Sequence, residues 1–256
     1  LRGRGAARVT VRLEREGLTA WIRWSRPERL NAWDRESLTA LGESLAEAGR
    51  SEARAIVLFG EGGSWSAGDD LHETARLTPE EWARALERFN RLTREVVAAQ
   101  QPVIAAIDGV CVGGAFELAY ACDVRVASPR SRFGCPEVAI GLSISNGFSA
   151  LMPRAARRLV LTGELVGAEQ ALRLGLVDVV ADDVEGEARR IAVRVGGLAP
   201  LAVAGSKRLL NEAERDALER ALDREAALCA QLFETADARE GLAAFLEKRE
   251  PRFRGA

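Results

Sequence analysis

Histidine, lysine, methionine and tyrosine are all scarce in this chain of 256 residues. It contains one histidine, His72, one methionine and one tyrosine, and its lysines are Lys207 and Lys248. A metal site built from several histidines is therefore excluded, and a Ser-His-Asp triad would have to use His72. Any acid–base chemistry falls to aspartate and glutamate side chains.

An excess of charge and a long apolar run are also missing. The chain has 36 Lys and Arg residues against 38 Asp and Glu residues, a net charge of −2. It therefore lacks the basic excess typical of proteins that bind nucleic acid or an anionic membrane surface. No run of about 18 apolar residues occurs, so the sequence predicts no transmembrane helix. A content of 47% apolar and 29% charged residues is typical of a folded globular protein.

The cysteines are few and scattered. The four of them form no Cys-x-x-Cys pair and no group with the spacing of metal ligands. We therefore expect free thiols, as is typical of a cytoplasmic protein, and no metal site. They are Cys111, Cys122, Cys135 and Cys229.

The apolar pattern predicts an α/β chain. Some segments alternate between apolar and polar residues, which indicates strands exposed on one face, and others are continuously apolar, which indicates strands covered on both faces. Asp34 and Thr78 are favourable N-caps for the helices that follow them. Beyond residue 145 the chain is mostly helical, so we expect one core with an appended helical segment. The expected strands are residues 9–13, 19–24, 55–59, 103–107 and 124–126, and the expected helices are residues 35–48, 79–100, 168–175, 185–198, 212–233 and 239–248.

Two loops that contain glycine follow buried strands and lead into helices, at residues 66–71 and 108–117. Glycine allows a sharp turn and the close approach of a ligand, and a helix N-terminus presents unpaired N–H groups with partial positive charge. N–H groups from both loops could therefore converge on one oxygen that gains negative charge, as in an oxyanion hole. Neither loop has the Gly-x-Gly-x-x-Gly or the Walker A pattern, so nucleotide phosphates are not indicated. Taken alone, each loop is equally compatible with a simple tight turn.

Two glutamates lie in apolar surroundings. Glu117 follows Gly114 by three residues in an apolar helix, and Glu137 follows Cys135-Pro136 and precedes an apolar segment. A buried carboxylate is unfavourable unless it has a partner or a chemical role. The two glutamates are therefore candidates for an acid–base pair, and the alternative is an ordinary role in salt bridges or helix caps.

Several short segments, in order along nearly the whole chain, resemble motifs of the enoyl-CoA hydratase/isomerase (crotonase) superfamily. The most diagnostic is GVCVGGAFELA at residues 109–119. The resemblance implies an α/β, crotonase-like (ClpP/crotonase) fold with a ββα spiral core. Residues 1–195 would form this core with the CoA site, and residues 196–256 a helical segment for trimerisation and closure of the CoA site. The other segments are RPERLNA at 26–32, WSAGDDL at 65–71, ACD at 121–123, FGCPE at 133–137, LTGE at 161–164, and residues 168–177.

The resemblance implies hydration of a 2-enoyl-CoA to a 3-hydroxyacyl-CoA. The N–H groups of Asp69 and Gly114 would bind the thioester carbonyl, and Glu117 and Glu137 align with both catalytic glutamates of the hydratases. An enoyl-CoA double-bond isomerase, which needs one of these glutamates, is the first alternative, and hydrolysis or C–C cleavage of an acyl-CoA on the same scaffold is the next. A non-catalytic binder, including an RNA-binding relative, is less favoured because the chain is nearly neutral. No cofactor is implied beyond the CoA that the substrate carries.

The resemblance also locates the CoA and implies an oligomer. CoA would lie along the turn at Arg29-Leu30 and along residues 67–71. Phe245 and Lys248 resemble positions of a C-terminal helix that often reaches the CoA of a neighbouring subunit, and a homotrimer or a dimer of trimers is implied. The expected substrate and CoA contacts are Arg29, Leu30, Ala67, Gly68, Asp70, Leu71, Phe245 and Lys248.

Some features depart from the family pattern. Asp69 stands where a small residue, usually alanine, is common, and a carboxylate there opposes an oxyanion unless it points away. Residues 141–148 replace a glycine-rich segment that shapes the acyl pocket, which leaves the acyl group open and weakens the assignment as a strict hydratase. The stretch after Arg154 is about five residues shorter than in relatives, which is more than one helical turn.

Overall fold

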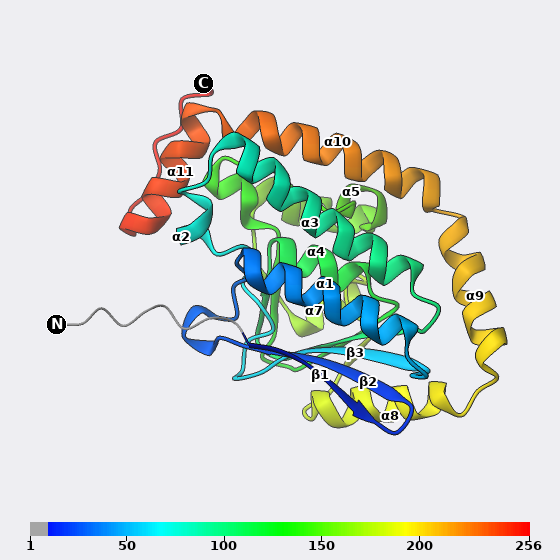
Figure 1. Ribbon diagram of the computed structural model, residues 1–256. Coiled ribbons are helices and arrows are strands. Elements are labelled where there is room, and N and C mark those ends of the chain that lie inside the picture. The colour runs from blue at the N-terminus through cyan, green and yellow to red at the C-terminus, as the bar shows by residue number, and fades with distance from the viewer. Residues whose placement is uncertain (1–9) are drawn as a thin grey trace.

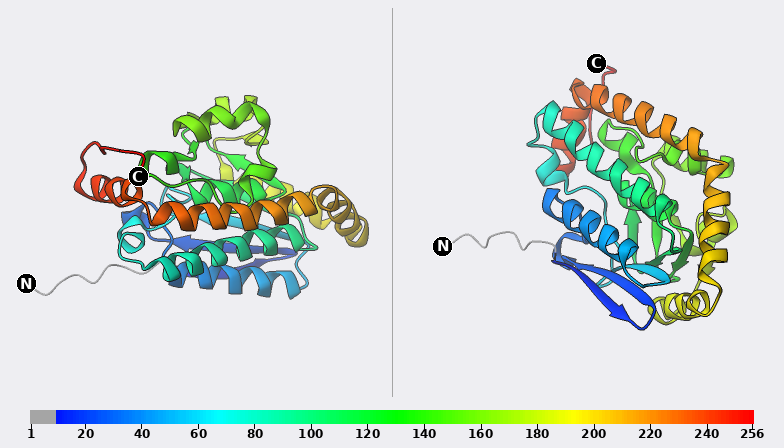
Figure 2. Two further views of the ribbon diagram at one scale, coloured as in Figure 1. Left: turned by 90° about the horizontal axis from the view of Figure 1, so that it is seen from above. Right: turned by 45° about the vertical axis from the view of Figure 1, so that its right-hand side comes forward.

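The computed structural model describes residues 10–256, which fold around two sheets (Figures 1 and 2). The chain begins with a hairpin of antiparallel strands β1 (Thr10–Glu16) and β2 (Thr19–Ser25). The hairpin turns at Gly17, whose φ of +59° is easily adopted by glycine. The strands expected at residues 9–13 and 19–24 are therefore found, although Val9 itself lies outside the described residues.

A six-stranded sheet forms the centre of the fold, with strand order β1-β2-β3-β4-β6-β9. All neighbouring strands beyond the first hairpin are parallel. β3 and β4 are almost completely buried, which explains their continuous apolar sequences. Because the carboxyl ends of parallel strands lie at the same edge of a sheet, the loops that follow β3 and β4 emerge side by side. The strands added to the hairpin are β3 (Ala55–Gly60), β4 (Val103–Ile107), β6 (Val124–Ala127) and β9 (Val179–Val180).

Helices cover both faces of this sheet (Figure 1). Apolar side chains of α1 (Arg35–Arg50), α3 (Pro79–Ala98) and α4 (Gly114–Ala121) pack on one face and form the main core. α8 (Val184–Gly196) packs on the opposite face, against side chains that include Trp21. The sheet is thus the middle layer of the molecule, and its strands β2, β3 and β4 are almost completely buried.

The expected helices are present, together with α9 (Pro200–Glu212) and several short helices. Asp34 and Thr78 each accept a hydrogen bond from the backbone N–H three residues ahead, at 2.9 and 3.3 Å, so both predicted N-caps are confirmed. The sequence reading missed α9, although Pro200 is a favourable first residue of a helix.

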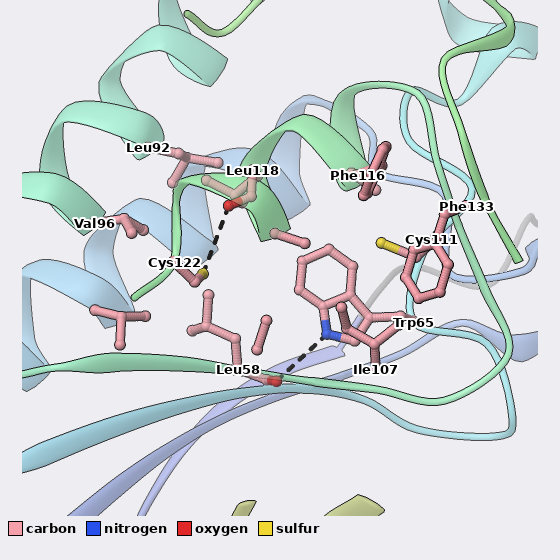
Figure 3. Packing of buried hydrophobic residues seen from close by; sticks show 14 of the residues in the cluster. Leu58, Trp65, Leu92, Val96, Ile107, Cys111, Phe116, Leu118, Cys122 and Phe133 are labelled. Atoms are coloured by element: carbon pink, nitrogen blue, oxygen red, sulfur yellow. Dashed lines mark hydrogen bonds between the residues drawn. The ribbon is translucent and has the colours of Figure 1, made fainter. Parts of the chain in front are cut away.

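Tryptophan rings fill the core beneath the loop that follows β3. Trp24, Trp33 and Trp65 pack edge to face, with ring centroids 5.0 to 5.7 Å apart. Figure 3 shows Trp65 beside Leu58, whose carbonyl accepts a hydrogen bond from Trp65 Nε1 at 3.4 Å. Trp65 therefore anchors the start of this loop in the core.

A small second sheet has the strand order β5-β7-β8. β5 (Val110–Val112) is parallel to β7 (Arg132–Gly134), and β8 (Val166–Gly167) is antiparallel to β7. β5 leads into α4, and β7 leads into the short 3₁₀ helix η2 (Pro136–Ile140). This pairing therefore sets the N-terminus of α4 beside η2. The remaining short elements are η1 (Pro27–Arg29), α2 (Leu71–Thr74), α5 (Phe148–Leu151), η3 (Arg154–Ala156), α6 (Arg157–Thr162) and α7 (Ala168–Arg173).

The C-terminal helices α9, α10 (Arg215–Phe233) and α11 (Ala236–Glu247) wrap around the core (Figure 2). α10 packs on α3 and α5, and α11 packs on η2 and α2. Lys207 of α9 is buried, and its Nζ donates to Asp123 at 2.7 Å and to two backbone carbonyls. Among the described residues, no helix has the length and apolar character needed to cross a membrane.

Candidate active site

The loop after β3 lies against β5 through a short backbone ladder. The N–H of Ser66 donates to the carbonyl of Val110 at 3.0 Å, and the N–H of Val112 donates to the carbonyl of Ser66 at 3.3 Å. Gly68 follows with a φ of +80°, and a Cβ at this position would lie 3.2 Å from the nitrogen of Gly114. Glycine at position 68 is therefore required for the loop to come this close to the N-terminus of α4.

The N–H groups of Asp69 and Gly114 have no backbone acceptor in the described part of the chain. Trp33 engages the peptide groups on both sides of Asp69, since its N–H donates to Gly68 at 2.7 Å and its carbonyl accepts from Asp70 at 2.9 Å. The carbonyl of Gly68 and the N–H of Asp69 belong to one trans peptide group, in which C=O and N–H point in opposite directions. The N–H of Asp69 therefore points away from Trp33. Gly114 is the first residue of α4, where N–H groups lack an intrahelical partner. The two loops thus bring two N–H groups without a backbone acceptor to neighbouring positions, and that of Asp69 also interacts with its own carboxyl group.

Gly113 turns the chain between β5 and α4. Its φ of +62° and ψ of −144° fall in a region that only glycine adopts readily. Its N–H donates to the carbonyl of Gly134 at 3.0 Å, and a Cβ on Gly113 would lie 3.2 Å from Glu137 Oε1. The pairing of β5 with β7 therefore brings Glu137 up to the glycine turn.

Glu117 is fully buried in the first turn of α4, with 0% of its surface exposed. Its carboxylate accepts hydrogen bonds from the N–H of Ser145 at 2.9 Å, the hydroxyl of Ser145 at 2.9 Å and the side-chain amide of Asn146 at 2.8 Å. Donors of this kind stabilise the ionised form of a carboxyl group. Residues 141–148, where the chain departs from the family pattern, therefore supply the groups that hold Glu117.

Glu137 lies in η2 and faces Glu117. One carboxylate oxygen of each glutamate and the Sγ of Cys135 all lie within 4.8 Å of one another. The Oε2 atom of Glu137 is buried and has no hydrogen-bond partner among the residues that the structure describes. The donors around the pair thus favour a carboxylate at Glu117, and they leave Glu137 as the group that carries a proton.

Burial raises the pKa of the three carboxyl groups at this site, those of Asp69, Glu117 and Glu137. Loss of hydration raises the pKa of Glu137 to about 8, and the charge of Asp69 acts in the same direction. Burial and the charge of Glu137 raise the pKa of Glu117 well above its usual value, against the hydrogen bonds from Ser145. Burial also raises the pKa of Asp69, to about 7. At neutral pH the two glutamates therefore share at least one proton.

The thiol of Cys135 lies beside this pair. Burial raises the pKa of the thiol well above its ordinary value, so the thiol stays neutral and is a poor ligand for a cation. Glu117, Cys135 and Glu137 are near enough to present three ligand atoms to one ion, but the neutral thiol and the hydrogen bonds to Glu117 do not favour this use. The expectation of no metal site stays a prediction.

The turn at Arg29-Leu30 lies against the same loop. The carbonyl of Leu30 accepts a hydrogen bond from the N–H of Ala67 at 3.0 Å, and the side chain of Leu30 is 51% exposed. Asp70, an expected CoA contact, has a structural side chain instead, because its carboxylate pairs with Arg26 at 2.8 Å and caps α2. The N–H of Asp70 donates to Trp33, so a contact of position 70 with CoA stays a prediction.

α11 carries the remaining expected CoA contacts. Phe245 is 53% exposed, and Lys248 is an exposed C-cap with a φ of +57°. α11 packs on η2 and α2 of its own chain, where Leu71 and Leu242 share one apolar cluster. α11 thus borders the loop of Asp69 within the same chain, and the expected contact with a neighbouring subunit stays a prediction.

The sequence reading missed Ser145 and Asn146 as partners of Glu117. Both are polar residues in a segment where relatives have glycines, which was a visible clue. Nothing in the neighbouring sequence, however, links them to Glu117, which lies 28 and 29 positions earlier. His72 is exposed and lies outside the acid pair, so it has no role in the arrangement described here.

Comparisons with known proteins agree with this geometry. The model of the family "Enoyl-CoA hydratase/isomerase" matches residues 14–256. The chain is 34% identical to the short-chain-enoyl-CoA hydratase of Clostridium acetobutylicum, over 94% of this chain and 95% of that protein. It is 38% identical to the (E)-benzylidenesuccinyl-CoA hydratase of Thauera aromatica, over 97% of this chain and 100% of that protein.

Solved structures of the same kind share the fold. The crystal structure of an enoyl-CoA hydratase from Mycobacterium avium subsp. paratuberculosis matches with a TM-score of 0.87 at 28% identity, covering 95% of this chain and 98% of that chain. An enoyl-CoA hydratase/isomerase from Xanthobacter autotrophicus matches with a TM-score of 0.84 at 31% identity, covering 96% of this chain and 98% of that chain. The expected crotonase-like α/β fold is confirmed.

Proposed function

The chain belongs to the enoyl-CoA hydratase/isomerase family, and we propose that it adds water to the double bond of a 2-enoyl-CoA. The product is a 3-hydroxyacyl-CoA. The observation that carries the proposal is the pair of carboxyl groups, Glu117 and Glu137, which face each other within 4.8 Å beside free backbone donors. Hydration needs a base for the water and an acid for the neighbouring carbon, whereas a double-bond isomerase needs a single proton-transfer group.

In this mechanism the thioester carbonyl accepts hydrogen bonds from the N–H groups of Asp69 and Gly114. When water adds at C3, the electrons of the double bond move towards C2 and the carbonyl, so the thioester oxygen gains negative charge. Donors held in advance stabilise this charge, and removal of one such donor typically costs about 3–4 kcal/mol. The N-terminus of α4 adds a partial positive charge at the same place.

Glu117 acts as the base and Glu137 as the acid. Glu117, whose ionised form is favoured by its donors, takes one proton from the water while the water oxygen bonds to C3. Glu137, whose Oε2 has no competing acceptor or donor among the described residues, delivers its proton to C2. The pair returns to its starting state when the proton gained by Glu117 passes to Glu137. Water is thus divided between C3, which gains hydroxyl, and C2, which gains hydrogen.

Hydration of crotonyl-CoA, followed as the loss of the conjugated enoyl absorbance, tests this assignment. Glu117→Gln and Glu137→Gln keep the shape of the side chains but cannot exchange the proton. Each is expected to lower kcat/KM by about 10²–10⁴-fold and to leave the affinity for CoA nearly unchanged. Unchanged turnover in either variant would reject the role given to that residue.

An isotope experiment separates hydration from the alternatives. In water enriched in heavy oxygen, a hydratase places the label on C3 of the product, and a double-bond isomerase places none. Release of free CoA thiol would instead indicate hydrolysis or C–C cleavage of the acyl-CoA.

We further propose that CoA lies along Leu30 and the loop from Ala67 to Leu71, closed by α11 of the C-terminal segment 196–256. The support is the contact of Leu30 with Ala67 and the packing of α11 on α2. An acyl-CoA substrate fits the family, and the proposed reaction uses no cofactor beyond that CoA. A homotrimer or a dimer of trimers, a core limited to residues 1–195 and a cytoplasmic location stay predictions, and light scattering tests the first of them.

A further inference from the structure

Asp69 places a carboxyl group near the N-terminus of α4, where the proposed oxyanion hole lies. Its Oδ2 lies 3.4 Å from the point where a Cβ on Gly114 would lie, and Asn146 Nδ2 lies at the same distance from that point. The side chain therefore does not point away from the N-terminus of α4. Asp69 Oδ2 and the amide of Asn146, which holds Glu117, thus both lie near Gly114, whose N–H is one of the two donors.

The carboxyl group of Asp69 has no cation or donor from another residue in the part of the chain that the structure describes. Its own N–H, Asp70 and Glu73 are the groups that act on it. Its charge also raises the pKa of Glu137 in η2, another acid. Arg26 is already paired with Asp70 at 2.8 Å, and Arg35 and Arg88, which line the same pocket as Asp69, form no ion pair with it among the described residues. The protein thus leaves this partly buried carboxyl group unpaired.

An acyl group in the proposed site must pass this carboxyl group. Its carbonyl oxygen lies at the N–H of Asp69, and its C2 and C3 face Glu117 and Glu137. An apolar acyl chain would cover the Asp69 carboxyl group and remove its water without replacing the hydrogen bonds, which is unfavourable. The ionised carboxylate would also oppose the charge that develops on the thioester oxygen.

We propose that Asp69 is a specificity-determining residue that favours 2-enoyl-CoA substrates with a hydrogen-bond donor, such as a hydroxyl group, next to the double bond. This inference rests on the proposed function. A hydroxyl group on C4 donates a hydrogen bond to Asp69 in place of the water that Asp69 loses. This hydrogen bond also weakens the repulsion between the Asp69 carboxylate and the thioester oxygen. A site built to hydrogen-bond a substrate group discriminates against the analogue that lacks it much more strongly than an apolar pocket discriminates by size.

Two substrates of equal size test the proposal. 4-Hydroxy-2-butenoyl-CoA and 2-pentenoyl-CoA differ by a hydroxyl group in place of a methyl group. We expect the unaltered protein to prefer the hydroxylated substrate by at least about tenfold in kcat/KM, and Asp69→Ala to abolish this preference. The ratio of the two substrates is the readout, because any effect of the substitution on the oxyanion hole applies to both and cancels.

Further variants make the experiment decisive. Asp69→Asn keeps an oxygen that accepts from the substrate hydroxyl, so it should retain part of the preference that Asp69→Ala loses. Glu80→Gln removes an exposed acidic charge on α3, which does not act on Asp69, and should leave the ratio unchanged. Equal kcat/KM values for both substrates in the unaltered protein, or a ratio that persists in Asp69→Ala, would overturn the specificity role while the hydratase assignment stands. Failure to hydrate either of these substrates or crotonyl-CoA would overturn both proposals.

Discussion

Removal of the Ser145 hydroxyl should test whether Glu117 acts as an ionised base, because the substitution raises the pKa of Glu117 without moving its carboxyl group. The hydroxyl donates to Glu117 Oε2 at 2.9 Å, and the backbone N–H of Ser145 donates to Oε1 at 2.9 Å. Ser145→Ala removes the first hydrogen bond and keeps the second, so the carboxyl group stays in place. A hydrogen bond to a charged group contributes about 1.5–3 kcal/mol. If Glu117 must be ionised to act, kcat/KM for crotonyl-CoA at pH 7 should fall by about ten- to a hundredfold.

The pH dependence distinguishes this reason from a general disturbance of the site. Burial already raises the pKa of Glu117, and loss of a donor to the charged form raises it further. At neutral pH less of the base is then ionised, so the activity of Ser145→Ala should recover as the pH rises, until loss of the Glu137 proton limits it. The measurement is kcat/KM between pH 6 and pH 9 for both proteins.

Ser143→Ala is the matched control, since it removes a hydroxyl in the same loop that, within the described part of the chain, makes no hydrogen bond to either glutamate. It should keep the wild-type rate and profile. If Ser145→Ala keeps the wild-type rate, or loses activity by the same factor at every pH, the reasoning that Glu117 acts as an ionised base held by Ser145 is refuted.

Three substitutions test other parts of the argument. Gly113→Ala should lower both turnover and the free energy of urea unfolding. The backbone conformation at this position costs a non-glycine residue about 1–3 kcal/mol, and the new Cβ would lie 3.2 Å from Glu137 Oε1. Full activity would contradict the geometry of the turn. Lys207→Met should lower the free energy of urea unfolding by about 2 kcal/mol, because two backbone carbonyls and the partly exposed carboxylate of Asp123 lose a buried donor. An unchanged midpoint of urea unfolding would contradict this. Glu137→Gln should be more stable than the unaltered protein at pH 9 but not at pH 4. The folded-state pKa of Glu137 is raised from 4.5 to about 8, so its contribution is full below the lower value and is lost as the pH rises through the higher one. Thermal unfolding at both pH values measures the difference, and a gain of equal size at both would disagree with this cause.

Features that depend on neighbouring residues were predictable from the sequence. Asp34 and Thr78 cap the helices that they precede, because a cap needs only a short polar side chain and N–H groups two or three residues ahead. The apolar runs of β3 and β4 identify strands buried on both faces. Gly68 and Gly113 mark the turns from which the free N–H groups emerge, since both residues have positive φ values.

Features that depend on distant residues were not predictable in this way. Ser145 and Glu117 are 28 positions apart, and the hydrogen bonds between them exist because α5 and α4 pack together. Lys207 and Asp123 are 84 positions apart, so a burial that is unfavourable for an isolated lysine becomes acceptable only through a partner on another element. The orientation of the Asp69 carboxyl group likewise follows from the approach of its loop to α4, and the motif alone left it open.

The unfavourable features of this fold occur together, and their common position is informative. Gly113 adopts a backbone conformation that other residues avoid, Glu137 has a buried oxygen without a partner, and Asp69 has a carboxyl group without a donor from another residue among those described. Each alone lowers stability, and a fold gains nothing from them as packing elements. All of them border the free N–H groups of Asp69 and Gly114, so a bound thioester would satisfy the donors, receive the proton of Glu137 and cover Asp69. The hydrogen-bonding groups that the protein leaves open are therefore those that a polar enoyl thioester can complete, which is why the geometry supports both the reaction and the preference proposed for Asp69.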